Sequence, residues 1–377
     1  MCETSCAERS ASRVRRLREL MGERGLDAMV VRELADLRWL TNVDGVLDED
    51  AAHTVFVTAD ELFLHTDSRY YNAFCERLGT NGIWQLDQET LSAGKWVAER
   101  IAASAAHKVA IEDTLPLSIF DELVEALGSD ADKVELVRLH GDLRVLRMVK
   151  DDDEIEFLRE AQRITDAAFE YVCSVIRPGM TERQIRGEIE SFMLKQGSDG
   201  PSFSTIVAAG ANGANPHACP SDYAVRKGDL IVLDYGALCH GYHADMTRTV
   251  CVGEPSERQR QVYDIVRRAH EECTAMLRPG INGKEVHEHS RKVISDAGFG
   301  DYYGHGLGHG VGIEIHEFPG LGRSWDKPVP AGSVVTVEPG IYLPGEFGIR
   351  LEDCGVLTEE GYKPFTALDH ELRVVGV

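Results

Sequence analysis

The sequence lacks the marks of several large protein classes, beginning with an excess of positive charge. Its 63 Asp and Glu residues outnumber its 40 Lys and Arg residues, which gives a formal net charge of −23. Proteins that bind nucleic acids need basic patches against the phosphates, so we expect no nucleic-acid partner. Long apolar runs are missing too: Ile231–Leu233 and Val334–Val337 are short, whereas a membrane-spanning helix needs about 18 apolar residues or more. We therefore expect no membrane partner.

Paired cysteines are also missing. The nine cysteines lie at positions 2, 6, 75, 173, 219, 239, 251, 273 and 354, and no Cys-x-x-Cys motif occurs. We interpret them as reduced thiols that mostly fill the core. The segment Met1–Arg9 has neither the basic start nor the apolar stretch of a secretory signal, so we expect a cytoplasmic protein.

Two domains are predicted from the chain length and from a change of pattern near residue 149. The chain has 377 residues, of which 43% are hydrophobic and 27% charged, as in ordinary globular proteins. In residues 1–148 helix and strand patterns alternate, which predicts a smaller α/β domain. The expected elements are a helix ending at Gly25, strands at Ala28–Val31 and Val109–Glu112, a hairpin at 54–57 and 61–65, and a helix at Leu117–Leu127. Asp151–Asp153 then cap a long amphipathic helix, which places the second domain at 149–377.

The second domain contains an internal repeat. Two long helix patterns each end in Arg-Pro-Gly, at 177–179 and at 278–280, and each is followed by another helix; Thr181 begins the first of these with capping-box spacing. The segments Gly228–Gly236 and Gly332–Gly340 align at a constant offset of 104 residues. We infer a duplicated half-domain folded about a pseudo-twofold axis, with its site at the junction. Chance similarity of two common helix–strand units is the alternative.

Each half of the repeat offers two carboxylates. Asp234 ends an apolar strand, and Asp245 follows across a hairpin whose turn we place at 239–240, so that the two aspartates face each other. In the second half, Glu338 occupies the place of Asp234, and Glu352 follows it. Four converging carboxylates repel one another unless cations lie between them. The alternative for the first pair is that one aspartate points to solvent.

A glycine-rich segment, 304–317, supplies possible nitrogen ligands. It holds His305, His309 and His316, and its glycines let the backbone approach a crowded centre. A strand is expected at Val311–His316. A lone histidine here would more often be structural, but three in twelve residues favour a ligand. Two divalent ions would cancel the charge of the four carboxylates. Oxygen ligands with one imidazole suit Mn²⁺ best, with Co²⁺, Zn²⁺ or Fe²⁺ as alternatives.

These residues resemble a known family. Five of them have 10, 63, 28 and 13 residues between successive members and occur in the order Asp234, Asp245, His309, Glu338, Glu352. This pattern is similar to that of the M24 metallopeptidases with the pita-bread fold, which include methionine aminopeptidase, aminopeptidase P and prolidase; the creatinase fold is their metal-free relative. The resemblance covers roughly 150–370 and implies an α+β catalytic domain.

The resemblance extends to the first domain and to the kind of substrate. Trp39–Thr41 and Asp67–Tyr70 resemble the creatinase/prolidase-type domain that precedes the catalytic one. Such a domain points to the Xaa-Pro branch, aminopeptidase P or prolidase. The implied activity is hydrolysis of the bond between an unblocked amino-terminal residue and proline in small peptides, by an enzyme that we expect to be a homodimer.

The same resemblance implies roles for the ligands. Asp234 would bind one ion, Asp245 and Glu352 would bridge both ions, and His309 and Glu338 would hold the second.

Further residues match the substrate side of the family's site. Three histidines match its substrate-side histidines: His217 in Asn-Pro-His-Ala, His305 and His316. Arg350 would support the ligands or bind substrate, and Glu338 would also take part in catalysis by moving a proton. The alternative for the proton transfer is the pair His305 and His316, which would also stabilise the tetrahedral oxyanion.

Two other functions stay open. One is a metal-independent, creatinase-type C–N hydrolase, which metal content after gentle purification would distinguish. The other is a non-catalytic peptide- or protein-binding module on the same fold, against which the complete ligand set argues. The acidic segment Asp44–Asp50 is expected to be a solvated loop, with the entrance of the cleft as its alternative place.

Overall fold

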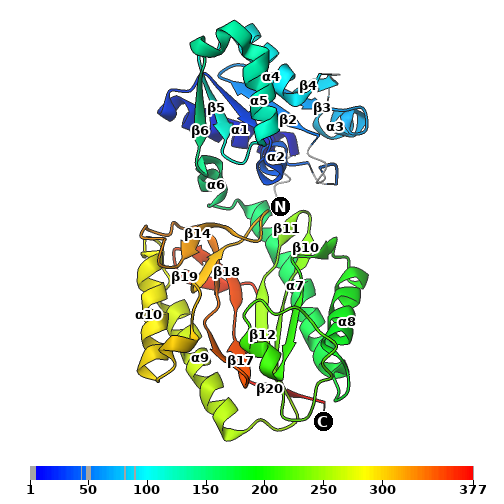
Figure 1. The fold of residues 1–377 in the computed structure, drawn as a ribbon, viewed down its shortest axis with the longest axis vertical. Coiled ribbons are helices and arrows are strands. Elements are labelled where there is room, and N and C mark those ends of the chain that lie inside the picture. The colour runs from blue at the N-terminus through cyan, green and yellow to red at the C-terminus, as the bar shows by residue number, and fades with distance from the viewer. Residues whose placement is uncertain (1–5, 44, 48–51, 80–81, 89–90, 377) are drawn as a thin grey trace. The chain divides into compact units, whose positions relative to one another are not determined.

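The protein is described by a computed structural model over residues 6–43, 45–47, 52–79, 82–88 and 91–376. The chain divides into two compact units, Met1–Arg147 and Met148–Val377, each of which is drawn in Figure 1. The acidic residues of the segment Asp44–Asp50 lie outside the described residues.

The first unit is built on one mixed sheet with the strand order β4-β3-β2-β1-β5-β6. Its strands are β1 (Ala28–Val31), β2 (Thr54–Thr58), β3 (Leu62–Thr66), β4 (Gln85–Gln88), β5 (Lys108–Glu112) and β6 (Glu135–Leu139). Its helices are α1 (Cys6–Arg24), α2 (Leu34–Thr41), α3 (Tyr71–Leu78), α4 (Ala93–Ser104), α5 (Leu117–Leu127) and α6 (Asp142–Arg147). Antiparallel pairing of β2 with β3 confirms the predicted hairpin. The helix predicted at Leu117–Leu127 is α5 and has the same bounds.

Four long helices flank the strands of the second unit. They are α7 (Asp152–Val175), α8 (Glu182–Lys195), α9 (Glu257–Met276) and α10 (Gly283–Asp296). Figure 1 shows α7 and α8 on one side of the strands and α9 and α10 on the other. Capping boxes fix the start of three of them, because Asp151, Thr181 and Ser256 each exchange hydrogen bonds with the residue three positions later.

Each half of the second unit contributes one main sheet. The first has the order β20-β12-β9-β8 and the second β14-β13-β15-β18-β19. The strands of the first are β8 (Ile206–Ala209), β9 (Leu230–Tyr235), β12 (Met246–Val252) and β20 (Arg373–Val375). Those of the second are β13 (Gly308–Gly310), β14 (Glu317–Leu321), β15 (Val334–Val337), β18 (Asp353–Thr358) and β19 (Gly361–Pro364). The remaining strands lie in two further sheets; they are β7 (Gly200–Pro201), β10 (Ala237–Cys239), β11 (Tyr242–His243), β16 (Gly340–Leu343) and β17 (Phe347–Arg350).

The two halves of the second unit share equivalent strands and equivalent hydrogen bonds. After each Arg-Pro-Gly turn, the glycine N–H donates to a valine carbonyl, Gly179 to Val225 and Gly280 to Val329, both at 2.8 Å. Both glycines have positive φ, 94° and 82°, a conformation that costs glycine little. The antiparallel strand series β8-β9-β12 recurs as β13-β15-β18. These equivalences confirm the predicted duplication.

The hairpin between β9 and β12 has a different register from the predicted one. Asp234 pairs with Thr247 and not with Asp245, because the turn lies one residue later, at His240 and Gly241. These two residues have positive φ, 54° and 75°, as a type I′ turn requires. The pairing moves by two residues in consequence, so Asp245 stays on the same face of the sheet and lies diagonal to Asp234.

The predicted strand at Val311–His316 is wrong. Strand β13 ends at Gly310 and β14 begins at Glu317, and the residues between them form a tight loop. Within it the Gly312 N–H donates to the Glu314 carbonyl, and the Glu314 N–H donates to the Glu317 carboxylate, each at 3.0 Å. These local bonds replace the ladder bonds that a strand would need.

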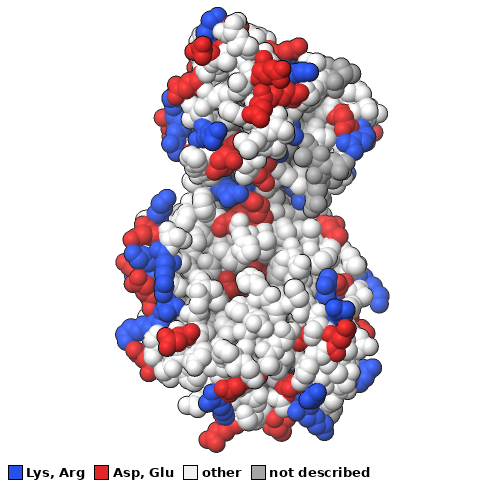
Figure 2. Space-filling model, viewed as in Figure 1, with Lys and Arg blue, Asp and Glu red and all other residues white. Residues whose placement is uncertain are grey.

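The surface carries charges of both signs. On the face shown in Figure 2, acidic and basic side chains are interspersed over both units. In the second unit they lie mainly toward the rim, while the middle of this face is largely uncharged. Among the residues that the structure describes, every helix is too short or too polar to span a bilayer.

Candidate metal centre

One cavity of about 450 Å³ in the second unit brings together every site residue that the sequence predicted. These residues come from both halves of the repeat and are His217, Asp234, Asp245, His305, His309, His316, Glu338, Arg350 and Glu352. Phe203, Ile206 and Ile315 add an apolar wall. A cavity of this size, with convergent polar groups and apolar sides, is typical of a small-ligand site.

In the first half, strand register positions the carboxylates. Asp234 lies on β9 opposite Thr247, and Asp245 lies two residues before Thr247, on the same face. Both aspartates are buried. The hairpin therefore presents two carboxylates side by side from one sheet.

The second half keeps this arrangement of strands but has different residues at the equivalent positions. The register of β15 and β18, continued by one residue, places Glu338 opposite Glu352. The residue two positions before Glu352 is Arg350, so an arginine stands where the first half has Asp245. Its guanidinium forms an ion pair with Asp234 across the two halves.

Burial and crowding together raise the pKa of Asp245, Glu338 and Glu352. The pKa values of Asp245 and Glu338 lie well above the usual range, mainly because burial disfavours the charged form and also because the other carboxylates repel it. The same causes raise the pKa of Glu352 to about 8. Within the described residues, Arg350 is the one positive charge that lowers the pKa of all three of these carboxyl groups. The cluster needs more positive charge before all its members can ionise together.

His309 turns one ring nitrogen toward this cluster. Its Nδ1 lies 3.0 Å from the Gly310 carbonyl, which can only accept, so Nδ1 carries the proton. The lone pair of Nε2 then faces Asp245 Oδ2 at 3.5 Å and Glu338 Oε1 at 3.6 Å. Burial lowers the pKa of His309 to about 4, so the ring is neutral near pH 7. A neutral imidazole held in this tautomer is the form that binds metal ions.

Close packing of the backbone fixes His309. A Cβ added at Gly308 would lie 2.0 Å from the Thr336 carbonyl oxygen, so a side chain there would push β13 away from β15. The His309 N–H also donates to Thr336 Oγ1 at 3.1 Å. The glycine predicted to allow close approach does so at this position.

The other three histidines differ in how far their nitrogens are engaged. His305 Nδ1 donates to the Gly306 carbonyl at 2.7 Å, and its Nε2 accepts from the Tyr342 hydroxyl at 2.9 Å. His316 and His217 are exposed on the cavity wall, and the His316 ring contacts that of His309 edge-on, with 4.3 Å between centroids. Two imidazoles are thus open to a ligand, whereas His305 is part of the wall.

Sequence reasoning missed Thr247 and Tyr342, which hold Arg350 in place. The Arg350 Nε donates to Thr247 Oγ1 at 3.1 Å, and its Nη1 donates to the Tyr342 hydroxyl at 2.9 Å. Thr247 Oγ1 in turn donates to Glu352 Oε2 at 2.6 Å. No motif in the sequence marks either residue, because both act through Arg350 and these contacts depend on how the strands pair.

The residues present fit a pair of divalent cations. One ligand atom each from Asp245, His309 and Glu352 lies within 4.8 Å of the others. Asp234 Oδ1 is buried and, within the described part of the chain, has no hydrogen-bond partner. A buried carboxylate oxygen without a partner is costly unless a cation satisfies it. Oxygen ligands with one imidazole are the donor set of Mn²⁺ and its neighbours.

Comparisons with known proteins agree with this geometry. The family model described as "Metallopeptidase family M24" matches residues 156–359, and the one described as "Creatinase/Prolidase N-terminal domain" matches residues 13–149. A protein named Xaa-Pro dipeptidase, from Lactobacillus delbrueckii subsp. lactis, is 37% identical over 294 residues, which cover 78% of this chain and 76% of the relative.

Solved structures show the same likeness. An Xaa-Pro dipeptidase from Bacillus anthracis is 35% identical with a TM-score of 0.90, and the match covers 97% of this chain and 100% of that one. An X-Pro aminopeptidase from Thermotoga maritima MSB8 is 34% identical with a TM-score of 0.84, over 96% and 99% of the two chains. The predicted α+β pita-bread fold with a preceding creatinase/prolidase-type domain is therefore confirmed.

Proposed function

Because the chain belongs to metallopeptidase family M24, we propose that it hydrolyses the bond between an unblocked amino-terminal residue and proline in small peptides. The observation that carries this proposal is the convergence of all nine predicted site residues on one cavity. Relatives named Xaa-Pro dipeptidase and X-Pro aminopeptidase, each at least 34% identical to this chain, support the proline preference.

The metal-binding part of the proposal assigns one role to each ligand. Asp234 would bind one divalent ion, Asp245 and Glu352 would bridge two, and His309 and Glu338 would hold the second. A bound pair of divalent ions polarises a carbonyl and lowers the pKa of water toward neutrality. Mn²⁺ is our proposed metal, with Co²⁺, Zn²⁺ or Fe²⁺ as alternatives, because hard oxygen ligands dominate the set.

The chain's own side chains would then bind and orient the peptide. His217 and His316 are the exposed imidazoles on the cavity wall, so they are placed to donate hydrogen bonds to the carbonyl oxygen as negative charge develops on it. The apolar side chains of Phe203, Ile206 and Ile315 line the same cavity and would contact the proline ring.

Proton transfer would fall to Glu338. A Xaa-Pro bond is a tertiary amide without an N–H, and its nitrogen must gain a proton as it leaves. The Glu338 carboxylate lies at the cavity with Oε1 3.6 Å from His309 Nε2, where it could accept a proton from water and pass it to the leaving nitrogen. His305 would serve as a positioning residue, because both its nitrogens are already hydrogen-bonded within the wall.

Arg350 would act through the ligands. It pairs with Asp234 and donates to Thr247 and Tyr342, so its five donors are largely engaged by the protein. We propose that it fixes the orientation of Asp234 and balances part of the negative charge of the carboxylates.

We also propose that the protein is cytoplasmic and forms a homodimer.

Hydrolysis assays with matched peptides test the function. The metal-free protein, reconstituted with Mn²⁺, should cleave Ala-Pro or Ala-Pro-Ala at least about tenfold faster in kcat/KM than Ala-Ala, a difference of about 1.4 kcal/mol in barrier. The comparison of the dipeptide with the tripeptide separates a dipeptidase from an aminopeptidase. Equal kcat/KM for Ala-Pro and Ala-Ala would remove the proline preference and leave only a metallopeptidase.

The same preparation tests the two rival functions. A creatinase-type hydrolase would keep its activity in strong chelator and act on guanidino compounds, whereas we expect chelation to abolish peptide hydrolysis and Mn²⁺ or Co²⁺ to restore it. A non-catalytic binding module would bind proline peptides without releasing products. Full peptidase activity in chelator would contradict the metal assignment.

A further inference from the structure

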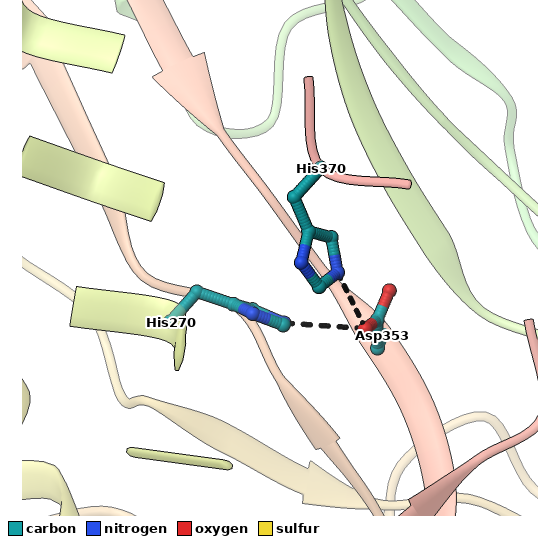
Figure 3. A group of neighbouring side chains, drawn as sticks. All are labelled: His270, Asp353 and His370. Carbon is teal, nitrogen blue, oxygen red and sulfur yellow. Dashed lines mark hydrogen bonds and ion pairs between the residues drawn. The ribbon is translucent and has the colours of Figure 1, made fainter. Parts of the chain in front are cut away.

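A second group of metal-ligand side chains lies outside the catalytic cavity. Figure 3 shows His270, Asp353 and His370, whose imidazoles point at the same carboxylate. His370 Nε2 lies 2.8 Å and His270 Nε2 lies 3.6 Å from Asp353 Oδ2. One ligand atom of each residue lies within 4.8 Å of the others. None of the three is among the residues that line the catalytic cavity.

Each member of this group comes from a different element and is held there. His270 lies on α9, Asp353 begins β18, and His370 lies on the segment that leads into β20. Arg248 Nη2 donates to Asp353 Oδ1 at 2.8 Å, which leaves Oδ2 to the imidazoles. Arg248 also donates to the carbonyls of the two residues before His370, and the Tyr263 hydroxyl donates to the His370 carbonyl at 3.2 Å. The three ligand atoms are therefore positioned by contacts outside the group itself.

His270 lacks the hydrogen bonds that a buried imidazole needs. Its side chain is completely buried, and within the described residues neither ring nitrogen has a hydrogen-bond partner. Leaving such a buried group without a partner destabilises the fold. Burial lowers the pKa of His270 to about 4, so the ring is neutral and offers a lone pair. Asp353 already has a cationic partner in Arg248, and it does not require an imidazolium ion for charge balance.

We propose that His270, Asp353 and His370 form a binding site for a divalent transition-metal ion, best suited to Zn²⁺ and separate from the catalytic centre. Two imidazole nitrogens and one carboxylate oxygen are ligands that Zn²⁺ takes in tetrahedral sites. The His370 side chain is 24% exposed, so an ion could reach the group from solvent, and water would be its fourth ligand. An ion there joins α9, β18 and the C-terminal segment, so its effect is to stabilise the fold.

Counting metal ions in variants of the full chain tests this site. In a background with Asp245→Ala and His309→Ala, the catalytic centre loses two ligands while the second group is untouched. After removal of metal and dialysis against Zn²⁺, we expect the addition of His370→Ala to lower the zinc content by one ion per chain. Zn²⁺ should also raise Tm in the background variant and have a much smaller effect once His370 is replaced.

The wild-type chain gives the same test without the catalytic substitutions. There, His370→Ala should again remove one zinc ion per chain and leave kcat with Mn²⁺ unchanged. His289→Ala is the matched control, because His289 Nε2 lies 2.8 Å from Glu272 Oε2 in an imidazole–carboxylate pair that lacks a second histidine. Unchanged zinc content in the His370 variant, or an equal loss in both variants, would overturn the proposal. The readout is metal content, so it does not depend on whether the chain cleaves Xaa-Pro bonds.

Discussion

Thr247 and Glu352 join the two halves of the repeat at the metal centre. The Thr247 hydroxyl donates to Glu352 Oε2 at 2.6 Å and accepts from Arg350 Nε at 3.1 Å. A threonine that nothing in the sequence singled out therefore orients a proposed bridging ligand. Hydrogen bonds to ligating carboxylates are known to tune metal affinity.

Replacement of this hydroxyl should weaken metal binding. Thr247→Val keeps the shape of the side chain and removes the bond to Glu352, so we expect roughly 10- to 100-fold weaker Mn²⁺ binding in a titration. Thr249→Val is the control, because within the described part of the chain the Thr249 hydroxyl bonds to the backbone of Arg350 and to no carboxylate. Equal losses of affinity in the two variants would show that Thr247 acts through the fold alone.

Removal of a proposed bridging carboxylate should abolish turnover. Asp245→Ala and Glu352→Ala should each lower kcat below a tenth of the wild-type value, because each loss is expected to disturb both ions. Glu346→Ala, at an exposed carboxylate paired with Arg258, should leave kcat unchanged. A variant of either bridging residue that keeps more than about a tenth of kcat, about 1.4 kcal/mol of barrier, would contradict its role.

The closeness of β13 to β15 gives a prediction about backbone packing. Gly308→Ala would place its Cβ 2.0 Å from the Thr336 carbonyl, so the strand that carries His309 must move. We expect kcat to fall at least about tenfold, together with about 1–3 kcal/mol of stability, as overpacking usually costs. Gly304→Ala is the matched control, since its added Cβ would meet nothing within 4 Å. Wild-type kcat in the Gly308 variant would mean that His309 tolerates this movement.

A buried acid in the first unit should make stability depend on pH. Burial and the neighbouring Asp36 raise the pKa of Glu112 to about 8. Because this folded-state value lies above the unfolded value, the group favours folding below about pH 4.5 and loses that contribution as pH rises through 8. Glu112→Gln should therefore leave Tm similar at pH 5 and raise it at pH 9.

The glutamine is a conservative test because it keeps the acceptor. The Arg32 and Glu33 N–H groups both donate to one oxygen of Glu112, at 2.7 and 2.9 Å, and an amide oxygen can accept both bonds. Thermal unfolding followed by circular dichroism at the two pH values gives the readout, with the exposed Glu61→Gln as control. A gain in Tm that is the same at pH 5 and pH 9 would argue against titration of Glu112.

Sequence patterns that depend on neighbouring residues predicted much of the fold. The capping box at Thr181 and the apolar run at Leu117–Leu127 depend on neighbouring residues, and both elements lie where the sequence predicted them. The repeat was visible because both halves keep the same turn chemistry. By contrast, α2 and α4 were missed, since their burial depends on contacts with segments far along the chain, such as the edge-to-face packing of Trp96 on Phe56.

The residues of the candidate site were predictable, whereas the pairing register of the strands that carry them was not. Residue types and spacing pointed to the four carboxylates and to the histidines of the glycine-rich segment, and the family resemblance added His217; all the selected residues share one cavity. The position of the hairpin turn was not predictable, because the positive φ values at His240 and Gly241 depend on strand twist as much as on sequence. The turn lies one residue later than predicted, which shifts the strand pairing by two residues. Asp245 therefore still lies on the predicted face of the sheet. The roles assigned to the nine residues stay predictions.

Differences between equivalent positions of the two halves make the site directional. Two identical halves about a pseudo-twofold axis would offer the same chemistry to a molecule and to its reverse. A peptide has an amine at one end and a carboxylate at the other, so a symmetric container would hold it equally well in two orientations, one of them unproductive. With Arg350 in the place of Asp245 and Glu352 in the place of Thr247, the two walls of the site differ in charge and in hydrogen-bonding groups. The two ends of a peptide therefore meet different surroundings.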